Sequence, residues 1–178
     1  APARPSEHPL GRIAHRRITN ARENVSGNAL LRLKNGYAPG DSDMLWSRIT
    51  HWRGVVASAF DAYPRDPVTS VDIDGPDDNP SVDIAAGWLS ASLGVAVRRI
   101  ASEQSASEPS RLFPVRRLTL HRDSGPVKVE VKDDKTLSVK IPGVAEAFVA
   151  MSVRSDADCL AEELRHLDPD WAYSQAVS

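Results

Sequence analysis

The spacing of the apolar residues changes near Pro67, and this change constrains the fold more than any other feature of the chain. From Leu10 to Pro64 the apolar residues recur three and four positions apart, which is typical of amphipathic helices. No strand signal is visible in that part. After Pro67 the spacing shortens to two, which is typical of strands with one buried face. The sequence therefore predicts a helical amino-terminal region followed by a sheet.

The sheet is expected to begin with a strand–helix–strand unit over residues 67–101. A strand around Val71 ends at Gly75-Pro76, and Asn79-Pro80 supplies the cap and first-turn proline of a helix that ends at Gly94. A second strand follows the helix directly, so the two strands are expected to lie parallel. The helix carries a regular apolar stripe: Val82, Ala85, Ala86, Leu89 and Leu93.

Four further strands are predicted after a Ser/Glu-rich loop over residues 101–111. They are centred on 115–121, 127–131, 137–141 and 149–153, and their short links indicate an antiparallel meander. One face of this meander is expected to face water and the other to be covered by helices. The polar residues assigned to the wet face are Lys128, Glu130, Lys132, Ser138 and Lys140. The acidic run 72–78 is interpreted as a solvated loop between the first strand and its helix.

The chain is predicted to end in a helix and a short final turn. Residues 155–158, Ser-Asp-Ala-Asp, have the pattern of a capping box. Leu160, Leu164 and Leu167 are expected to form the apolar stripe of the helix, and Asp168-Pro169 to end it. The predicted fold class is α+β: a mixed, largely antiparallel sheet of about six strands with helices on one side, preceded by a helical amino-terminal region.

Composition and charge limit the classes of protein that the chain can belong to. Its 178 residues have a net charge of −2 and contain one cysteine, Cys159, which excludes an internal disulfide. No apolar run approaches the length of a membrane span, and a reducing cytoplasm is the expected location. Residues 1–65 hold ten basic and five acidic residues, whereas the remainder holds twelve and nineteen. Residues 1–9 are interpreted as a proline-stiffened linker from a further amino-terminal domain, with 10–65 as a basic helical region and 66–178 as the sheet region.

A tryptophan- and arginine-rich helix after the Gly36–Gly40 loop is the most informative local feature. Asp41 or Ser42 is expected to cap it, and its buried stripe is predicted to be Leu45, Ile49, Trp52, Val56, Ala59 and Phe60. Trp46 and Arg53 lie together on one flank of this stripe, and Arg48 lies on the other. Two interpretations are open. The flanks contact another protein, or Trp46 is a second core tryptophan and the arginines pair with local carboxylates.

The sequence contains no recognisable catalytic or nucleotide-binding motif. The glycines fit no phosphate-binding loop, and no serine lies in a nucleophile elbow. Cys159, Glu163 and His166 share one helix face, but a solvated face is the preferred interpretation and no metal or other cofactor is expected. The arginines between Arg12 and Arg22 could contact nucleic acid, yet the acidic remainder of the chain argues against that partner.

Four blocks of sequence resemble one family: 9–20, 36–53, 79–89 and 158–170. Taken together they are similar to the carboxy-terminal domain of OpcA, the family of bacterial glucose-6-phosphate dehydrogenase assembly proteins. The resemblance implies a non-catalytic, allosteric activator that binds glucose-6-phosphate dehydrogenase and promotes its active oligomer. It would thereby control entry into the oxidative pentose phosphate pathway. It also implies a separate amino-terminal domain.

The resemblance assigns no interface residues, so the candidate contact comes from helix geometry and charge. We expect Trp46, Arg48 and Arg53, together with Arg16 and Arg17, to form a basic and aromatic contact for the dehydrogenase. Tyr37 in the Gly36–Gly40 loop is a further candidate. The alternative is an enzyme or sensor for a small phosphorylated metabolite, with Arg16, Arg17 and Tyr37 as its anion-binding residues.

Overall fold

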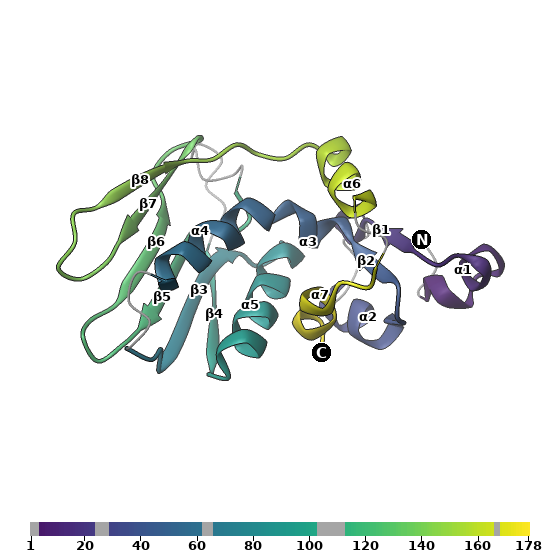
Figure 1. Cartoon of the computed structure of the whole chain (residues 1–178), viewed down its shortest axis with the longest axis horizontal. Helices are drawn as coiled ribbons and strands as arrows, with labels where there is room; N and C mark the ends of the chain where they lie inside the picture. The colour runs from purple at the N-terminus through teal and green to yellow at the C-terminus, as the bar shows by residue number, and fades with distance from the viewer. Residues whose placement is uncertain (1–3, 24–28, 62–65, 103–112, 166–167) are drawn as a thin grey trace.

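The computed structural model describes residues 4–23, 29–61, 66–102, 113–165 and 168–178. Figure 1 shows a sheet at one end of the molecule, helices across it, and a smaller helical part that carries the amino terminus at the other end. The sheet has the strand order β4-β3-β5-β6-β7-β8. Its strands are β3 (Ser70–Pro76), β4 (Val97–Ser102), β5 (Arg117–His121), β6 (Val127–Val131), β7 (Thr136–Lys140) and β8 (Ala147–Ala150). The predicted α+β class with a six-stranded, mostly antiparallel sheet is confirmed.

The strand–helix–strand unit also agrees with the prediction. β3 and β4 pair in parallel, with Val71 opposite Val97, and α5 (Pro80–Leu93) connects them. Asn79 caps α5 by accepting a hydrogen bond from the Ser81 amide, and Gly94 ends it with φ of 65°. A residue with a Cβ rarely adopts that left-handed conformation, so glycine suits the end of this helix. The other four strand pairs are antiparallel.

The two faces of the sheet differ in the way that the alternation predicts. Val71 and Ile73 are fully buried and belong to one core with residues of α4 and α5. On the opposite face Asp72 pairs with Arg98 and His121, so the strand continues through most of the acidic run that was interpreted as a loop. Ser138 was also expected to face water, and this is wrong. It is buried opposite Phe148 in the β7–β8 register, and its hydroxyl donates to Glu146.

The predicted tryptophan-rich helix is two helices, α3 (Met44–Arg48) and α4 (Thr50–Asp61), separated at Ile49. Asp43 caps α3 by accepting from the Leu45 amide, so the expectation of a cap at Asp41 or Ser42 is wrong. Those two residues belong to a strand instead. The predicted stripe is buried from Leu45 to Ala59, while Phe60 is only partly buried at the end of α4.

The amino-terminal region contains strands that the sequence analysis did not predict. β1 (Arg17–Thr19) and β2 (Asp41–Asp43) pair in parallel, with Ile18 opposite Ser42. Three residues are too few to display an alternating pattern, which explains why the prediction was wrong here. The remaining elements are helical: η1 (Pro5–Glu7), α1 (Pro9–Ile13), η2 (Ala21–Glu23) and α2 (Ala29–Gly36).

The carboxy-terminal helices are α6 (Asp156–Leu164) and α7 (Trp171–Ala176). The capping box at Ser155 and Asp158 is confirmed. The predicted leucine stripe is wrong, because Leu160 and Leu164 are 41% and 56% exposed, and Leu167 lies outside the described residues. The face that packs inward, against α3, carries Cys159 and Glu163 instead. A glutamate on a buried face needs a partner, and that partner leads to the candidate site.

No helix in the described residues is long and apolar enough to cross a bilayer.

Candidate functional site

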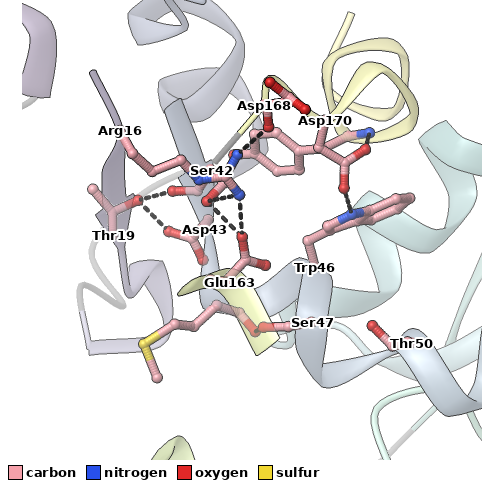
Figure 2. A network of polar contacts seen from close by, with 12 residues as sticks. Arg16, Thr19, Ser42, Asp43, Trp46, Ser47, Thr50, Glu163, Asp168 and Asp170 are labelled. Carbon is pink, nitrogen blue, oxygen red and sulfur yellow. Dashed lines mark hydrogen bonds and ion pairs between the residues drawn. The ribbon is translucent and has the colours of Figure 1, made fainter. Parts of the chain in front are cut away.

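Glu163 is the centre of a polar network that joins the two ends of the chain (Figure 2). Its Oε2 accepts hydrogen bonds from Ser42 Oγ at 2.6 Å and from Arg16 Nη2 at 2.9 Å. Arg16 Nη1 donates to the carbonyl oxygen of Asp168 at 2.8 Å. Only 10% of the Arg16 side chain and 4% of the Glu163 side chain are exposed. The pair therefore fixes α6 and the start of the carboxy-terminal segment to β1 and β2.

Trp46 makes a second connection to the same carboxy-terminal segment. Its indole Nε1 donates to Asp170 Oδ2 at 2.7 Å, and Asp170 Oδ1 accepts from the Tyr173 amide at the start of α7. The Trp46 ring packs against Tyr173 with 6.0 Å between ring centroids. The Arg53 guanidinium also lies 3.4 Å from the Trp46 ring centroid, a close cation–π stack.

Burial changes the titration of the charged groups around this network. Desolvation raises the pKa of Asp43 to about 6, although Thr19 and the amides of Leu45 and Ala21 donate to its carboxylate. Desolvation also lowers the pKa of Arg53 to about 10, because the cation stacks on an indole instead of being fully hydrated. The pKa of the Tyr173 phenol is raised, also by desolvation. The network is thus a region of low dielectric in which charges interact strongly.

A pocket of about 450 Å³ opens above the network. Arg53 and Trp46 line it together with Glu162, Asp170 and Trp171. Trp171 is 79% exposed, the largest exposure among the aromatic residues in the described core and helices. Since the lining combines both charges with an aromatic surface, the pocket suits a side chain or loop of another protein better than a simple anion.

The structure distributes the six predicted contact residues over different environments. It brings Arg16, Trp46 and Arg53 to this pocket, whereas Arg17 pairs with Asp41 and donates to the carbonyl oxygens of Gly11, Ala14 and Pro39. Arg48 pairs with Asp156, and Tyr37 is partly buried with its ring 6.2 Å from that of Tyr173.

These residues therefore do not form one open patch. Trp46 is 2% exposed, which corresponds to the second interpretation of the sequence, a core tryptophan covered by another helix. Arg48 pairs with a carboxylate as that interpretation states, while Arg53 stacks on Trp46 instead. Contact of the six residues with the dehydrogenase stays a prediction.

Sequence reasoning did not assign Glu163, Asp170 and Trp171 to the site. Glu163 had a signal, since it stands four residues after Cys159 on one helix face, but that spacing was considered only for a metal. In the described residues no three His, Cys, Asp or Glu side chains gather as a metal site would require, and His166 lies outside them. Trp171 and Asp170 follow Asp168-Pro169, where the sequence indicated only a final turn.

Comparison with known proteins gives one finding. A family model described as the C-terminal domain of the glucose-6-phosphate dehydrogenase subunit matches residues 39–177. The match includes α3, α4, α6 and α7, and therefore the whole pocket except Arg16. No curated protein and no solved structure matches the chain.

Proposed function

This chain belongs to the OpcA family, as the C-terminal domain of its glucose-6-phosphate dehydrogenase subunit, and on that premise we propose that it is a non-catalytic assembly factor. It binds glucose-6-phosphate dehydrogenase in the cytoplasm and favours the active oligomer of that enzyme. The family match over most of the chain is the observation that carries this proposal. The pocket geometry supports a place for the contact.

Trp171 is the proposed centre of the contact with the dehydrogenase. Tryptophan and arginine dominate the energetics of protein interfaces, and Trp171 stands with Arg53 at one pocket. Its helix is held rigidly, because Asp170 caps α7 and also accepts from Trp46. A rigid, exposed indole loses little conformational entropy on binding. The buried residues Arg16 and Trp46 support the contact by positioning the carboxy-terminal segment.

The proposed activation follows from differential binding to two states of the enzyme. A partner that binds the active oligomer about tenfold more tightly than the inactive one shifts the population tenfold, which corresponds to about 1.4 kcal/mol. Truncation of a single hot-spot residue typically costs about 2 kcal/mol or more. One tryptophan contact is therefore large enough to account for the shift.

The test is sedimentation of the dehydrogenase with the purified protein and with its Trp171→Ala variant. We expect the variant to bind at least about 30-fold more weakly, because a loss of 2 kcal/mol corresponds to that factor. Phe148→Ala is the matched control, since Phe148 is also a largely exposed aromatic residue but lies on β8. Unchanged binding by folded Trp171→Ala would remove α7 from the interface. Turnover of a substrate by the protein alone would contradict the non-catalytic assignment.

The alternative site for a phosphorylated metabolite at Arg16, Arg17 and Tyr37 has less support. Arg16 already donates to Glu163, Ser42 and the Asp168 carbonyl, and Arg17 donates to one carboxylate and three carbonyl oxygens. An anion there would have to displace those acceptors. Thermal-shift measurements with sugar phosphates on Arg17→Ala discriminate between the two functions, since only the alternative predicts a ligand shift that this variant loses.

A further inference from the structure

A second, smaller cavity lies between the α3–α4 junction, the start of α5 and the segment that leads from β8 to α6. Its volume is about 130 Å³. Four cationic or titratable side chains line it, Arg22, Arg48, His51 and Arg154, and Ser81 lines it at the start of α5. Apolar side chains, among them Phe113, complete the wall.

The charge of this cavity differs from that of the Trp171 pocket. Its lining includes three arginines and no carboxylate, whereas the larger pocket is lined by Glu162, Glu163, Asp168 and Asp170. Asp156 pairs with Arg48 from outside the cavity, and its side chain is largely exposed. Glu162 lies 3.6 Å from Arg154, also outside the lining. The positive groups therefore outnumber their carboxylate partners, and an anion would find an attractive potential inside the cavity.

Two buried donors on the lining residues have no hydrogen-bond partner in the described part of the chain. They are Arg48 Nε, on a side chain that is 8% exposed, and Ser81 Oγ, on a residue that is 1% exposed. A buried donor without an acceptor is costly, and native proteins rarely retain one without a reason. The oxygen atoms of an anion are the acceptors that a guanidinium N–H and a hydroxyl both favour.

We propose that this cavity binds a small oxyanion, namely phosphate or the phosphate group of a small metabolite. Arg48 and Ser81 donate to it from the buried wall, and Arg22, His51 and Arg154 surround its charge. The volume is well below the roughly 300 Å³ at which pockets begin to enclose drug-sized ligands, so a nucleotide is too large. This site is independent of the proposed contact at Trp171, and its failure would leave the partner-binding proposal intact.

The experiment is calorimetric titration of the purified protein with inorganic phosphate, at ionic strength held constant with chloride. We expect saturable binding with one site per chain, weakened about tenfold or more in Arg22→Ala, because that side chain is exposed and its loss leaves the fold intact. Arg12→Ala is the matched control, since it removes another exposed arginine outside the cavity lining. Equal weakening in both variants, or no saturation at about 10 mM phosphate, would overturn the proposal.

Ser81→Ala gives a second, sharper readout. Removal of an unpartnered buried hydroxyl does not destabilise the free protein, so its melting temperature without phosphate stays equal or rises. Phosphate affinity is expected to fall at least about threefold, because the ligand loses one donor. A variant that binds phosphate as tightly as the natural chain would exclude Ser81 from the site. Titration with a small phosphate monoester then separates the two sources, since tighter binding than inorganic phosphate identifies a metabolite and weaker binding identifies the free ion.

Discussion

Replacement of Glu163 by glutamine tests whether the buried Arg16–Glu163 pair holds the carboxy-terminal segment in place. The variant keeps the shape and one acceptor oxygen but removes the negative charge opposite a guanidinium that is itself nine-tenths buried. Breaking a buried pair on one side typically costs about 3–5 kcal/mol, because the remaining charge stays desolvated. We expect the lower end, about 3 kcal/mol, since the amide oxygen can still accept from Ser42 or Arg16.

Urea denaturation is the assay, with the free energy of unfolding as the measured quantity. A loss of about 3 kcal/mol would lower the melting temperature by about 6–12 °C in a chain of this size. Glu7→Gln is the control, because Arg4 and Glu7 form an ion pair at 2.8 Å whose side chains are more than half exposed. Such a surface pair contributes about 0–1 kcal/mol, so the control is expected to unfold close to the natural chain.

The double variant Arg16→Met/Glu163→Leu makes the test stricter. Exchange of both charges for apolar side chains of similar volume leaves no unpaired charge, so most of the stability lost in Glu163→Gln is expected to return. Ser42 Oγ loses its acceptor in this variant, which limits the recovery. A Glu163→Gln variant that loses less than about 1 kcal/mol would refute the reasoning, as would a double variant less stable than the single one.

Three further outcomes follow from individual contacts. A Cβ at Gly87 would lie 2.0 Å from the Ala176 carbonyl oxygen, so Gly87→Ala is expected to lower the free energy of unfolding by about 1–3 kcal/mol, whereas Gly54→Ala, with open space around it in α4, should raise it by about 0.5–1 kcal/mol in the same denaturation assay. Because the folded pKa of Asp43 is about 6 against an ordinary 3.8, its contribution to stability is fully present below pH 3.8 and is lost as the pH rises through 6. The stability of the natural chain relative to Asp43→Asn is therefore expected to fall by about 3 kcal/mol between pH 4 and pH 7, and a flat difference would contradict the raised pKa. Cys159 is fully buried and desolvation raises the pKa of its thiol, so it should react with a thiol reagent only at the rate of unfolding, and fast labelling of the native protein would contradict this placement.

The sequence was sufficient to predict the sheet because long, regular patterns depend on local rules. The βαβ unit was predictable from the cap at Asn79, the glycine at Gly94 and the alternation around Val71, each of which acts within a few residues. β1 and β2 were not predictable, because two three-residue strands pair only through a contact between segments more than twenty positions apart. The break at Ile49 was missed for a related reason, since the apolar stripe continues across it.

The orientation of α6 shows where pattern reasoning fails for a candidate site. Leucines at 160 and 164 and a cysteine–glutamate face at 159 and 163 are both helical stripes, and hydrophobicity alone selects the leucines. The structure selects the other face because Arg16 and Ser42 supply the partners that a buried glutamate requires. That choice depends on residues more than 120 positions away, so it cannot be read from the helix itself.

The unequal distribution of charge along the chain follows from the same long-range contacts. The basic amino-terminal third suggested a surface for a partner, yet two of its arginines meet the acidic carboxy-terminal segment: Arg16 pairs with Glu163, and Arg48 with Asp156. Trp46 also meets that segment, at Asp170. Charges that compensate each other across the chain favour its closure and leave little net charge where they meet. Partner recognition then depends on what this closure leaves uncovered, and around the network that residue is Trp171, which no feature of the charge pattern indicates. Exposed tryptophan beside a stacked arginine is therefore a better guide to the dehydrogenase contact than basic residues counted along the sequence.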